Sequence, residues 1–205
     1  MKPTDHTIIL HHAADYVRQP WKNGQGETTE IARSPGAAFI WRLSMADITR
    51  DGAFSDFTGL DRTFLLLEGA GVGLYLGRAE VAHQVDQTSR VMAFDGGMTV
   101  RGELLSGPVK ALNIMTRQSR VRHHMEPGTA ASRTFLSDKN TTRLLFSLDD
   151  GLSVLLSGRT YRLGRHDMLE LTCDSPTEMR VMPTSETGPQ MSPGIPYVMI
   201  TIIES

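Results

Sequence analysis

Several residue types and sequence features that mark particular classes of proteins are scarce or absent in this chain. Its 205 residues include one cysteine, Cys173, so neither a disulfide within the chain nor a cysteine-rich metal site can form. Aromatic residues make up only 6% of the sequence, and low-complexity tracts and long runs of one charge are missing. The hydrophobic content of 40% is that of an ordinary globular protein, so we expect a folded protein from a reducing compartment.

Neither sign of charge is in large excess. The chain has 21 Lys and Arg and 23 Asp and Glu, which give a formal net charge of -2. Such a balance offers no electrostatic footprint for nucleic acid or for an anionic membrane, and we expect neither partner. The longest apolar stretch, Phe64 to Leu76, is broken by Glu68 and small residues and cannot span a bilayer. The first ten residues hold Asp5 and only a three-residue apolar run, which is not a secretory signal. The expected compartment is the cytoplasm.

What the chain does contain is a succession of short apolar runs with period-two alternation, separated by Gly, Pro, Asp and Ser clusters. This pattern predicts an all-β protein. In the run from Phe39 to Ala46, large apolar residues alternate with smaller or polar ones, and we expect the larger apolar face to be buried. The two faces are Phe39, Trp41, Leu43 and Met45 on one side and Ile40, Arg42, Ser44 and Ala46 on the other.

A second pattern relates the two halves of the chain. The segment from Leu65 to Leu76 lies 80 positions before the similar segment from Leu145 to Leu156, and this offset places Gly71 on Gly151. It predicts an internal duplication and hence a bicupin of two antiparallel β-barrels or jelly rolls. A single large β-sandwich is the alternative.

The expected organisation is one bicupin body over residues 1–205. The first cupin barrel, with the proposed pocket, covers residues 10–118. Residues 119–139 form a linker with a short helix between Gln118 and Lys139, and the second barrel covers residues 140–205.

Residues for metal binding and catalysis do not form a convincing set. No His-x-His occurs, and the adjacent pairs His11-His12 and His123-His124 would point to opposite faces of a strand, so we expect no metal and no other cofactor. Cys173 has no basic neighbour in sequence and reads as an inert buried thiol. We therefore predict no catalytic residue.

Polar residues embedded in apolar strands are the main candidates for function. Arg42 and Ser44 share one strand face, Arg62 opens an apolar strand, and Asn113 interrupts the run from Ala111 to Met115. A buried polar group without a partner costs about 1–3 kcal/mol, and a charge costs more, so each of these residues implies a partner.

That partner is either protein or ligand. Within the protein, Arg62 could pair with Asp61 or Asp51, and Arg42 with Glu30. Otherwise the guanidinium fork best fits a carboxylate ligand. Aromatic walls would complete such a pocket, and the candidates are Trp21, Trp41, Phe54 and Phe57.

The stretch from Trp21 to Ala32 adds a polar turn, in which Gly24 and Gly26 permit close approach of the backbone. Together with later segments it forms a recognisable set of motifs, which are Trp21-Lys-Asn-Gly-x-Gly-x-Thr-x-Glu30-Ile-Ala, Trp41-Arg-Leu-Ser-Met-Ala-Asp47, Asp51-Gly-x-Phe-Ser55-x-Phe-x-Gly59-x-Asp-Arg62 and Asn113-x-Met-Thr-Arg117.

In these motifs the chain resembles the HutD/Ves family, over about residues 10 to 118, with the remainder similar only in length and architecture. The resemblance implies a bicupin without the usual cupin metal motif and a small-molecule pocket in the first barrel. It also implies a link to histidine utilisation for HutD members or to stress responses for Ves members, with no established enzymatic activity.

Two residues depart from the expected family pattern. Gln25 stands in place of a third glycine, and Ala111 stands in place of an acidic residue two positions before the Asn. The first narrows the backbone freedom of the turn, and the second removes a carboxylate from the strand.

The resulting hypothesis is a cytoplasmic, non-catalytic protein that binds a small carboxylate metabolite such as urocanate or formylglutamate and modulates histidine utilisation. Arg42 and Arg62 would hold the carboxylate oxygens. The residues expected to orient the ligand are Asn23, Thr29, Glu30, Ser44 and Asn113.

Several alternatives stay open. One is a cupin-type enzyme, either a metal-dependent oxygenase or a metal-free isomerase or hydrolase with Glu30 as base. A Ves-like stress-associated protein and a structural or partner-binding protein are others. Because cupins commonly dimerise, a homodimer is also left open.

Overall fold

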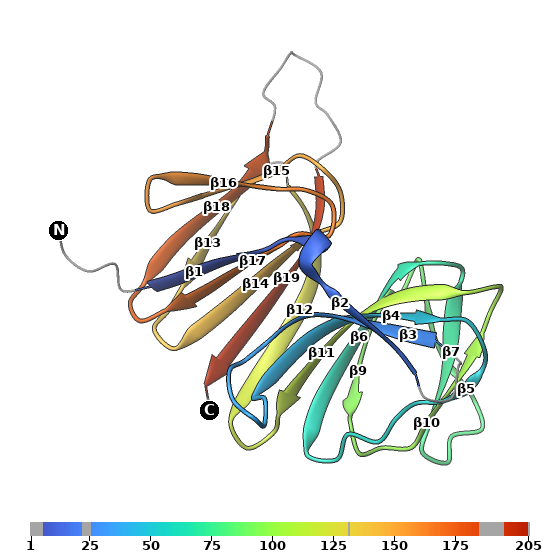
Figure 1. Ribbon diagram of the computed structural model, residues 1–205. Helices are drawn as coiled ribbons and strands as arrows, with labels where there is room; N and C mark the ends of the chain where they lie inside the picture. Colours follow the sequence, from blue (N-terminus) through green and yellow to red (C-terminus); the bar gives the residue numbers. More distant parts are fainter. Residues whose placement is uncertain (1–5, 22–25, 131, 185–194, 205) are drawn as a thin grey trace. The chain divides into compact units, whose positions relative to one another are not determined.

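The computed structural model describes residues 6–21, 26–130, 132–184 and 195–204 (Figure 1). Within these residues the chain forms nineteen β-strands and a single 3-10 turn, η1 (Ala13–Asp15). The prediction of an all-β protein is confirmed. No helix in the described part is long and apolar enough to cross a membrane.

The chain divides into two compact units. One comprises residues 16–122, here called the pocket unit, and the other comprises residues up to Asp15 together with residues 123–204, here called the terminal unit. Each unit contains two sheets.

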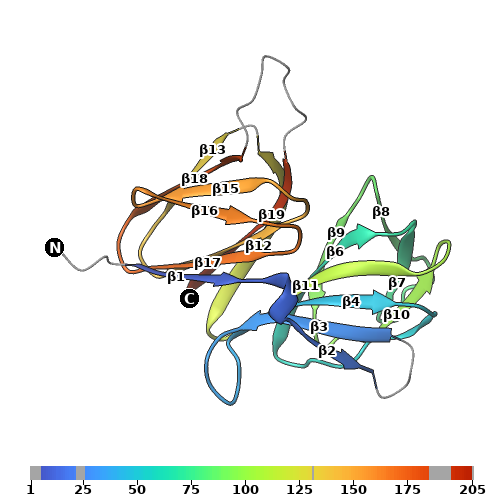
Figure 2. The same cartoon turned by 45° about the horizontal axis from the view of Figure 1, so that its top comes forward.

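The pocket unit contains a six-stranded sheet in the order β2-β3-β4-β11-β6-β9 and a four-stranded sheet in the order β5-β10-β7-β8 (Figure 2). The strands of the first sheet are β2 (Val17–Pro20), β3 (Gly26–Arg33), β4 (Trp41–Ile48), β11 (Val109–Arg117), β6 (Leu60–Glu68) and β9 (Val91–Asp95). Those of the second are β5 (Gly52–Ala53), β10 (Val100–Leu104), β7 (Gly71–Leu76) and β8 (His83–Asp86).

Alternating side chains on these strands build the core of the pocket unit. Phe64 and Leu66 of β6 pack with Val72 and Leu74 of β7 in one buried cluster, so side chains of both sheets fill the space between them. The opposite face of the six-stranded sheet is also apolar, and Leu43 is fully buried there.

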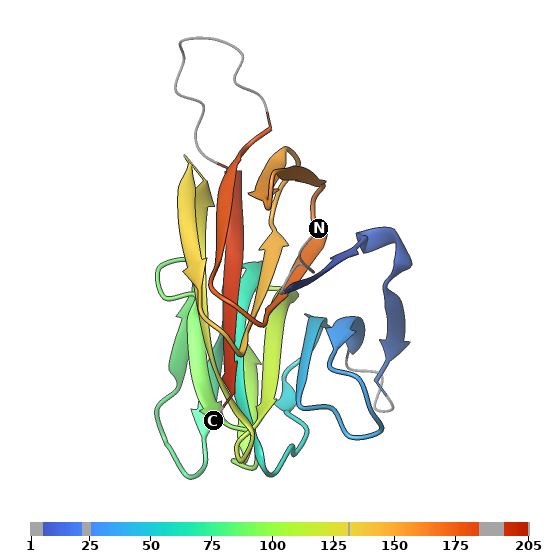
Figure 3. The same ribbon diagram turned by 90° about the vertical axis from the view of Figure 1, so that its left-hand side faces the viewer.

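The terminal unit contains a five-stranded sheet in the order β1-β17-β14-β19-β12 and a four-stranded sheet in the order β13-β18-β15-β16. In Figure 3 the red strand β19 lies between the yellow β12 and the orange β14, as this order requires. The strands are β1 (His6–His11), β17 (Met168–Cys173), β14 (Thr141–Ser147), β19 (Ile195–Glu204), β12 (Val121–Ala130), β13 (Arg133–Ser137), β18 (Thr177–Pro183), β15 (Leu152–Leu156) and β16 (Arg159–Leu163).

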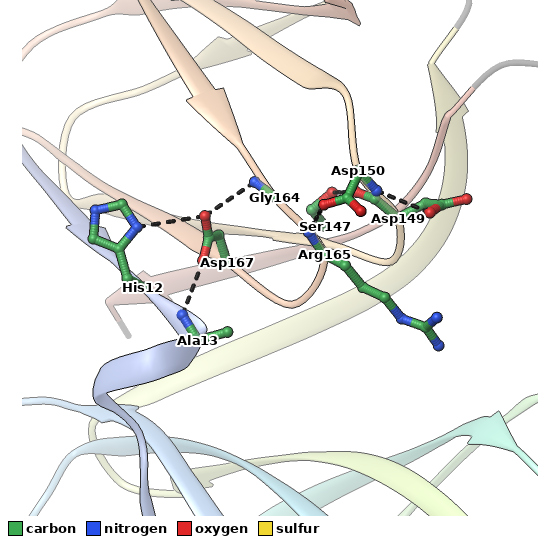
Figure 4. Close-up of polar contacts among 8 residues, drawn as sticks. All are labelled: His12, Ala13, Ser147, Asp149, Asp150, Gly164, Arg165 and Asp167. Atoms are coloured by element: carbon green, nitrogen blue, oxygen red, sulfur yellow. Dashed lines mark hydrogen bonds and ion pairs between the residues drawn. The ribbon is translucent and has the colours of Figure 1, made fainter.

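The first strand of the chain belongs to this second pair of sheets, because β1 pairs antiparallel with β17 (Figure 1). Asp167 fixes the turn that follows β1, since its Oδ1 accepts from the Ala13 amide at 2.9 Å and its Oδ2 from the Gly164 amide at 3.0 Å (Figure 4). His12 Nδ1 lies 3.4 Å from Oδ2 of the same carboxylate. Neighbouring His11 contacts Glu170 of β17 at 2.9 Å.

The two units repeat one strand order. In the pocket unit the run β4-β11-β6-β9 has the same chain order as β12-β19-β14-β17 in the terminal unit, and β5-β10-β7-β8 matches β13-β18-β15-β16. Beyond this shared set, β2 and β3 extend one sheet and β1 extends the other.

The strand ladders correct part of the expected offset. Both Phe64 and Leu145 belong to the cluster between the sheets of their own unit, whereas Leu65 points to the opposite side of β6 from Phe64. Phe64, and not Leu65, therefore corresponds to Leu145. This one-residue shift is not visible in the sequence because the two halves have low identity. It requires the connection between β6 and β7 to be one residue longer than the corresponding connection in the terminal unit.

The stretch predicted as a linker, residues 119–139, holds β12 and β13. The short helix expected between Gln118 and Lys139 is therefore wrong for the described part of that segment, which leaves out only residue 131. The sequence from His123 to Gly128 does not resemble a strand because it contains Pro127 and Gly128, yet both residues lie within β12. Gly128 allows the Tyr197 ring to lie close to the backbone.

The strands of the described residues do not close into the two barrels predicted from the sequence. In each unit the hydrogen-bonded strands make separate sheets, so the observed architecture is two layers of strands around a core.

Candidate functional site

The pocket unit contains a partly open cavity of about 570 Å³. This volume falls in the range of small-molecule sites, which is roughly 300–1,000 Å³. The residues around it are Gln19, Pro20, Trp21, Thr28, Arg42, Ser44, Ala46, Ile48, Ala53, Phe54, Ser55, Phe57, Arg62, Phe64, Asn113 and Met115.

Strand alternation gathers the polar residues of the cavity. Arg42 and Ser44 project from one face of β4, Arg62 from β6, and Asn113 from β11 between them. The ladder places Asn113 opposite both Ser44 and Phe64, so these side chains come from adjacent positions on three neighbouring strands. Polar groups far apart in the sequence thus line one wall.

Arg62 is the most unusual of these residues, because it is a charged side chain with only 6% of its surface exposed. Its Cζ lies 5.5 Å from the ring centre of Phe54, 5.1 Å from Phe57 and 5.0 Å from Phe94. These contacts supply cation–π attraction. They also surround the charge with apolar surface and keep water away from it.

The hydrogen bonds of Arg62 are incomplete. Nη1 donates to the Ser55 carbonyl at 3.4 Å and Nη2 to Asn113 Oδ1 at 3.5 Å, which are both long for such bonds. Nε is buried and has no hydrogen-bond partner within the described part of the chain. No carboxylate of the described residues forms an ion pair with this guanidinium.

Burial lowers the pKa of Arg62 to about 10 because the charged form loses its hydration. The group nevertheless remains protonated at neutral pH. The cavity wall therefore carries a positive charge that no carboxylate of the described residues balances.

Arg42 lies in a different electrostatic environment. Its Nε donates to Oε2 of Glu30 at 2.8 Å, and the same carboxylate lies 3.7 Å from Arg33. Of the internal pairings considered for the two arginines, the Arg42–Glu30 pair is thus present. The pairs between Arg62 and Asp61 or Asp51 are not among the ion pairs of the described residues.

Trp21 and Thr28 close another side of the cavity. Trp21 donates from its indole Nε1 to Thr28 Oγ1 at 2.7 Å, and its backbone amide donates to the Gly26 carbonyl at 2.9 Å. A Cβ at Gly26 would lie 2.3 Å from the Asp47 carbonyl and 3.1 Å from the Trp21 ring. Glycine is therefore required at this position of the polar turn for steric reasons.

The structure brings most of the candidate residues to one place. Arg42, Ser44, Arg62 and Asn113 line the cavity, as do the proposed wall residues Trp21, Phe54 and Phe57. Thr29, Glu30 and Trp41 do not line it. Thr29 and Trp41 are buried with 5% exposure each, on the other face of their strands, while Glu30 holds Arg42. Asn23 and Gln25 lie outside the described residues.

Sequence reasoning missed several apolar lining residues that period-two alternation could have found. Ala46 and Ile48 continue the face of Arg42 and Ser44, Phe64 follows Arg62, and Met115 follows Asn113. Alternation does not identify Phe94, which contacts Arg62, because Phe94 lies on β9 and not on the strand of any candidate residue.

No group of three or more His, Cys, Asp or Glu side chains that could hold a metal ion occurs in the described ranges. Cys173 is fully buried in the core of the terminal unit. Among the residues that the structure describes, the cavity offers hydrogen-bonding side chains and the charge of Arg62, which has no counter-charge there.

Paired antiparallel sheets in this arrangement give the chain a cupin-like fold. A cupin 2 conserved barrel domain protein from Leptotrichia buccalis superimposes with a TM-score of 0.52 at 8% identity, covering 87% of this chain and 88% of that one. At so low an identity the likeness concerns the fold alone. More specifically, the chain belongs to the HutD family, whose model, described as HutD, matches residues 13–187.

Relatives within the family are similar over most of their length. The chain is 37% identical over 174 residues to an uncharacterised 21.2 kDa protein in the hutC 3' region of Pseudomonas putida, covering 80% of this chain and 86% of the relative. It is 34% identical over 157 residues to Protein Ves of Citrobacter koseri, covering 72% and 80%. The structure of HutD from Pseudomonas fluorescens SBW25 matches with a TM-score of 0.81 at 30% identity, covering 97% of this chain and 100% of that one.

Proposed function

We propose that this protein binds a small carboxylate metabolite in the cavity of the pocket unit and modulates histidine utilisation without catalysing a step. The observation that carries the proposal is Arg62, a buried guanidinium with an unsatisfied Nε and no carboxylate partner in the described part of the chain. A buried donor left unsatisfied costs about 1–3 kcal/mol. A ligand that supplies the missing acceptor recovers that cost.

A carboxylate is the ligand group that fits best. It accepts charge-assisted hydrogen bonds from a guanidinium in a planar fork, and at the buried Arg62 the attraction between the opposite charges is less screened than in water. Ser44 and Asn113 supply further polar contacts on the same wall. Ile48, Phe54 and Met115 supply apolar surface for the rest of a small metabolite.

The physiological link comes from the relatives. One is described by its place in the hutC 3' region, and another solved relative is named HutD. Urocanate and formylglutamate are therefore the first ligands to test, with action in the cytoplasm as part of the proposal. The structure of HutD from P. fluorescens is that of a formate condition, which suggests formate as the simplest carboxylate probe.

Thermal unfolding in the presence of urocanate, formylglutamate, formiminoglutamate, histidine and formate tests the proposal. A ligand at about 100 times its dissociation constant stabilises the folded state by about 2.7 kcal/mol, which raises the melting temperature by roughly 5–10 °C for a chain of this size. We expect at least one carboxylate to give such a shift.

Arg62→Met should abolish the shift while keeping a side chain of similar length. Arg78→Met is the matched control, because it removes the same charge from an exposed position in the same unit. Absence of a shift with every compound, or an unchanged shift in Arg62→Met, would show the proposal to be wrong.

We also propose that the two units arose by internal duplication, so that the protein is a bicupin in the sense of two related halves. The repeated strand order of the two units supports this origin.

A further inference from the structure

Two arginines occupy matching places in the two units. Arg62 of β6 pairs across the ladder with Met115 of β11, and Arg143 of β14 pairs with Thr201 of β19. Because β6 and β11 correspond to β14 and β19 in the repeated strand order, the two guanidinium groups start from equivalent positions.

The surroundings of the two arginines match in part, although Arg62 is buried and Arg143 is half-buried. The Cζ of Arg62 lies 5.5 Å from the Phe54 ring, and the Cζ of Arg143 lies 5.6 Å from the Phe135 ring. In each unit the residue after that phenylalanine accepts a hydrogen bond through its carbonyl, Ser55 from Arg62 and Leu136 from Arg143. The likeness therefore extends from strand order to individual atoms.

The difference lies in how fully each guanidinium is satisfied. Arg143 donates from Nε to Ser137 Oγ at 2.5 Å, from Nη1 to Thr201 Oγ1 at 2.9 Å and from Nη2 to the Leu136 carbonyl at 2.7 Å. Every nitrogen thus has a short hydrogen bond. Arg62 has two long ones and a bare Nε, and Met115 stands where the terminal unit has the hydroxyl of Thr201.

We propose that the Arg143 cluster is a closed copy of the anion site, in which two hydroxyl groups of the chain occupy the positions that ligand oxygens take at Arg62. This inference rests on the proposed function of the Arg62 cavity. It assigns one anion site to each chain. It also defines the ligand class at Arg62 as an anion with at least two acceptor oxygens, which replace Ser137 Oγ and Thr201 Oγ1.

The first test transfers the closing hydroxyl into the cavity. Met115→Thr places a hydroxyl opposite Arg62, as Thr201 does opposite Arg143, and Met115→Val makes the same truncation without the hydroxyl. Titration calorimetry with sodium formate should show at least about tenfold weaker binding for Met115→Thr than for Met115→Val, because the new hydrogen bond competes with the probe. Equal affinities would contradict the inference.

The second test opens the closed copy. In an Arg62→Met background, which lacks the first site, Ser137→Ala with Thr201→Val removes both hydroxyls and retains side-chain volume at position 201. We expect this triple variant to bind one formate per chain and Arg62→Met alone to bind none. Failure of the folded triple variant to bind, or two formates per wild-type chain, would overturn the inference.

These outcomes separate the inference from the proposed function. If the wild-type protein binds no formate and no other carboxylate, the proposed function fails, while gain of binding in the triple variant still supports a closed site at Arg143. Circular dichroism establishes folding. Should the triple variant not fold, Arg62→Met with Thr201→Val alone gives the same test with one hydroxyl removed.

Discussion

The guanidinium of Arg42 on β4 is held by the carboxylate of Glu30 on β3, with 2.8 Å between Nε and Oε2. This ion pair crosses from one strand to the next at the wall of the cavity and neutralises one of its two arginines. The other, Arg62, lies on β6 without such a partner in the described residues. Two arginines of the same wall, on strands separated by β11, thus differ in what they offer a ligand.

Glu30→Gln should strengthen anion binding. Removing the carboxylate leaves the charge of Arg42 unbalanced on the same wall as Arg62, and the added attraction should raise affinity for formate about threefold to tenfold at low salt, decreasing as ionic strength rises. Calorimetric titration at two salt concentrations measures the effect. Glu27→Gln is the control, since Glu27 pairs with the exposed Arg18. Weaker binding by Glu30→Gln would indicate that Glu30 itself contacts the ligand.

Arg62→Met should stabilise the unliganded protein by about 1–3 kcal/mol at pH 7, because it removes a desolvated charge and an unsatisfied donor. Burial lowers the pKa of Arg62 to about 10, well below its ordinary value. Between about pH 10 and the ordinary pKa the unfolded state therefore binds more protons, and wild-type stability from this group rises with pH across that window. The difference in free energy of unfolding between Arg62→Met and wild type should be constant below about pH 10 and decrease above it. Urea unfolding of both proteins at matched pH measures the difference, and a variant less stable than wild type at pH 7 would refute the prediction.

Tyr197→Phe should stabilise the terminal unit. The ring of Tyr197 is fully buried against Phe135, and its hydroxyl has no hydrogen-bond partner in the described part of the chain. Deleting the hydroxyl should raise the free energy of unfolding by about 1 kcal/mol, without loss of packing. Gly128→Ala is the contrasting change, because a Cβ there would lie 2.5 Å from the Tyr197 ring, and it should destabilise by about 1–3 kcal/mol. A destabilised Tyr197→Phe would mean that the hydroxyl is satisfied, for instance by water.

Asp167→Asn should loosen β1 from the terminal unit. Both carboxylate oxygens of Asp167 accept backbone amide hydrogen bonds, from Ala13 and from Gly164 (Figure 4). An amide replaces one acceptor with a donor that faces an N–H group, which should cost about 1–3 kcal/mol. Hydrogen exchange of the β1 amides should accelerate in this variant. Asp149→Asn serves as control, because the exposed Asp149 side chain accepts only the adjacent Asp150 amide among the bonds drawn. Similar exchange in both variants would contradict the role of Asp167.

The strands and the residues of the cavity wall were predictable because each leaves a local trace. Arg42, Arg62 and Asn113 stand out as polar residues in apolar strands, and alternation gives the face on which each projects. For Arg42 the sequence leaves an internal partner, Glu30, and a ligand both open, and the structure contains the pair with Glu30.

The contacts that could not be predicted from the sequence depend on pairing between strands that are distant along the chain. That Phe94 contacts Arg62, that β1 joins β17, and that Arg143 is the counterpart of Arg62 all follow from ladder registers. A one-residue shift in the repeat, from Leu65 to Phe64, changes every such correspondence because it moves side chains to the opposite face. The predicted helix failed for a related reason: Pro127 and Gly128 suggested a break, yet strand pairing tolerates both.

The pairing of β1 with β17 also bears on the order of events during synthesis. The pocket unit is a continuous stretch of chain and contains all of its own strands, so it can fold as soon as it leaves the ribosome. In contrast, β1 is translated before that unit but must wait for Met168–Cys173 to find its partner. The ribosome thus delivers the pocket unit first, while β1 stays unpaired until residues 168–173 have been synthesised. Because such distant pairing slows folding, we expect closure of the terminal unit to be the late step.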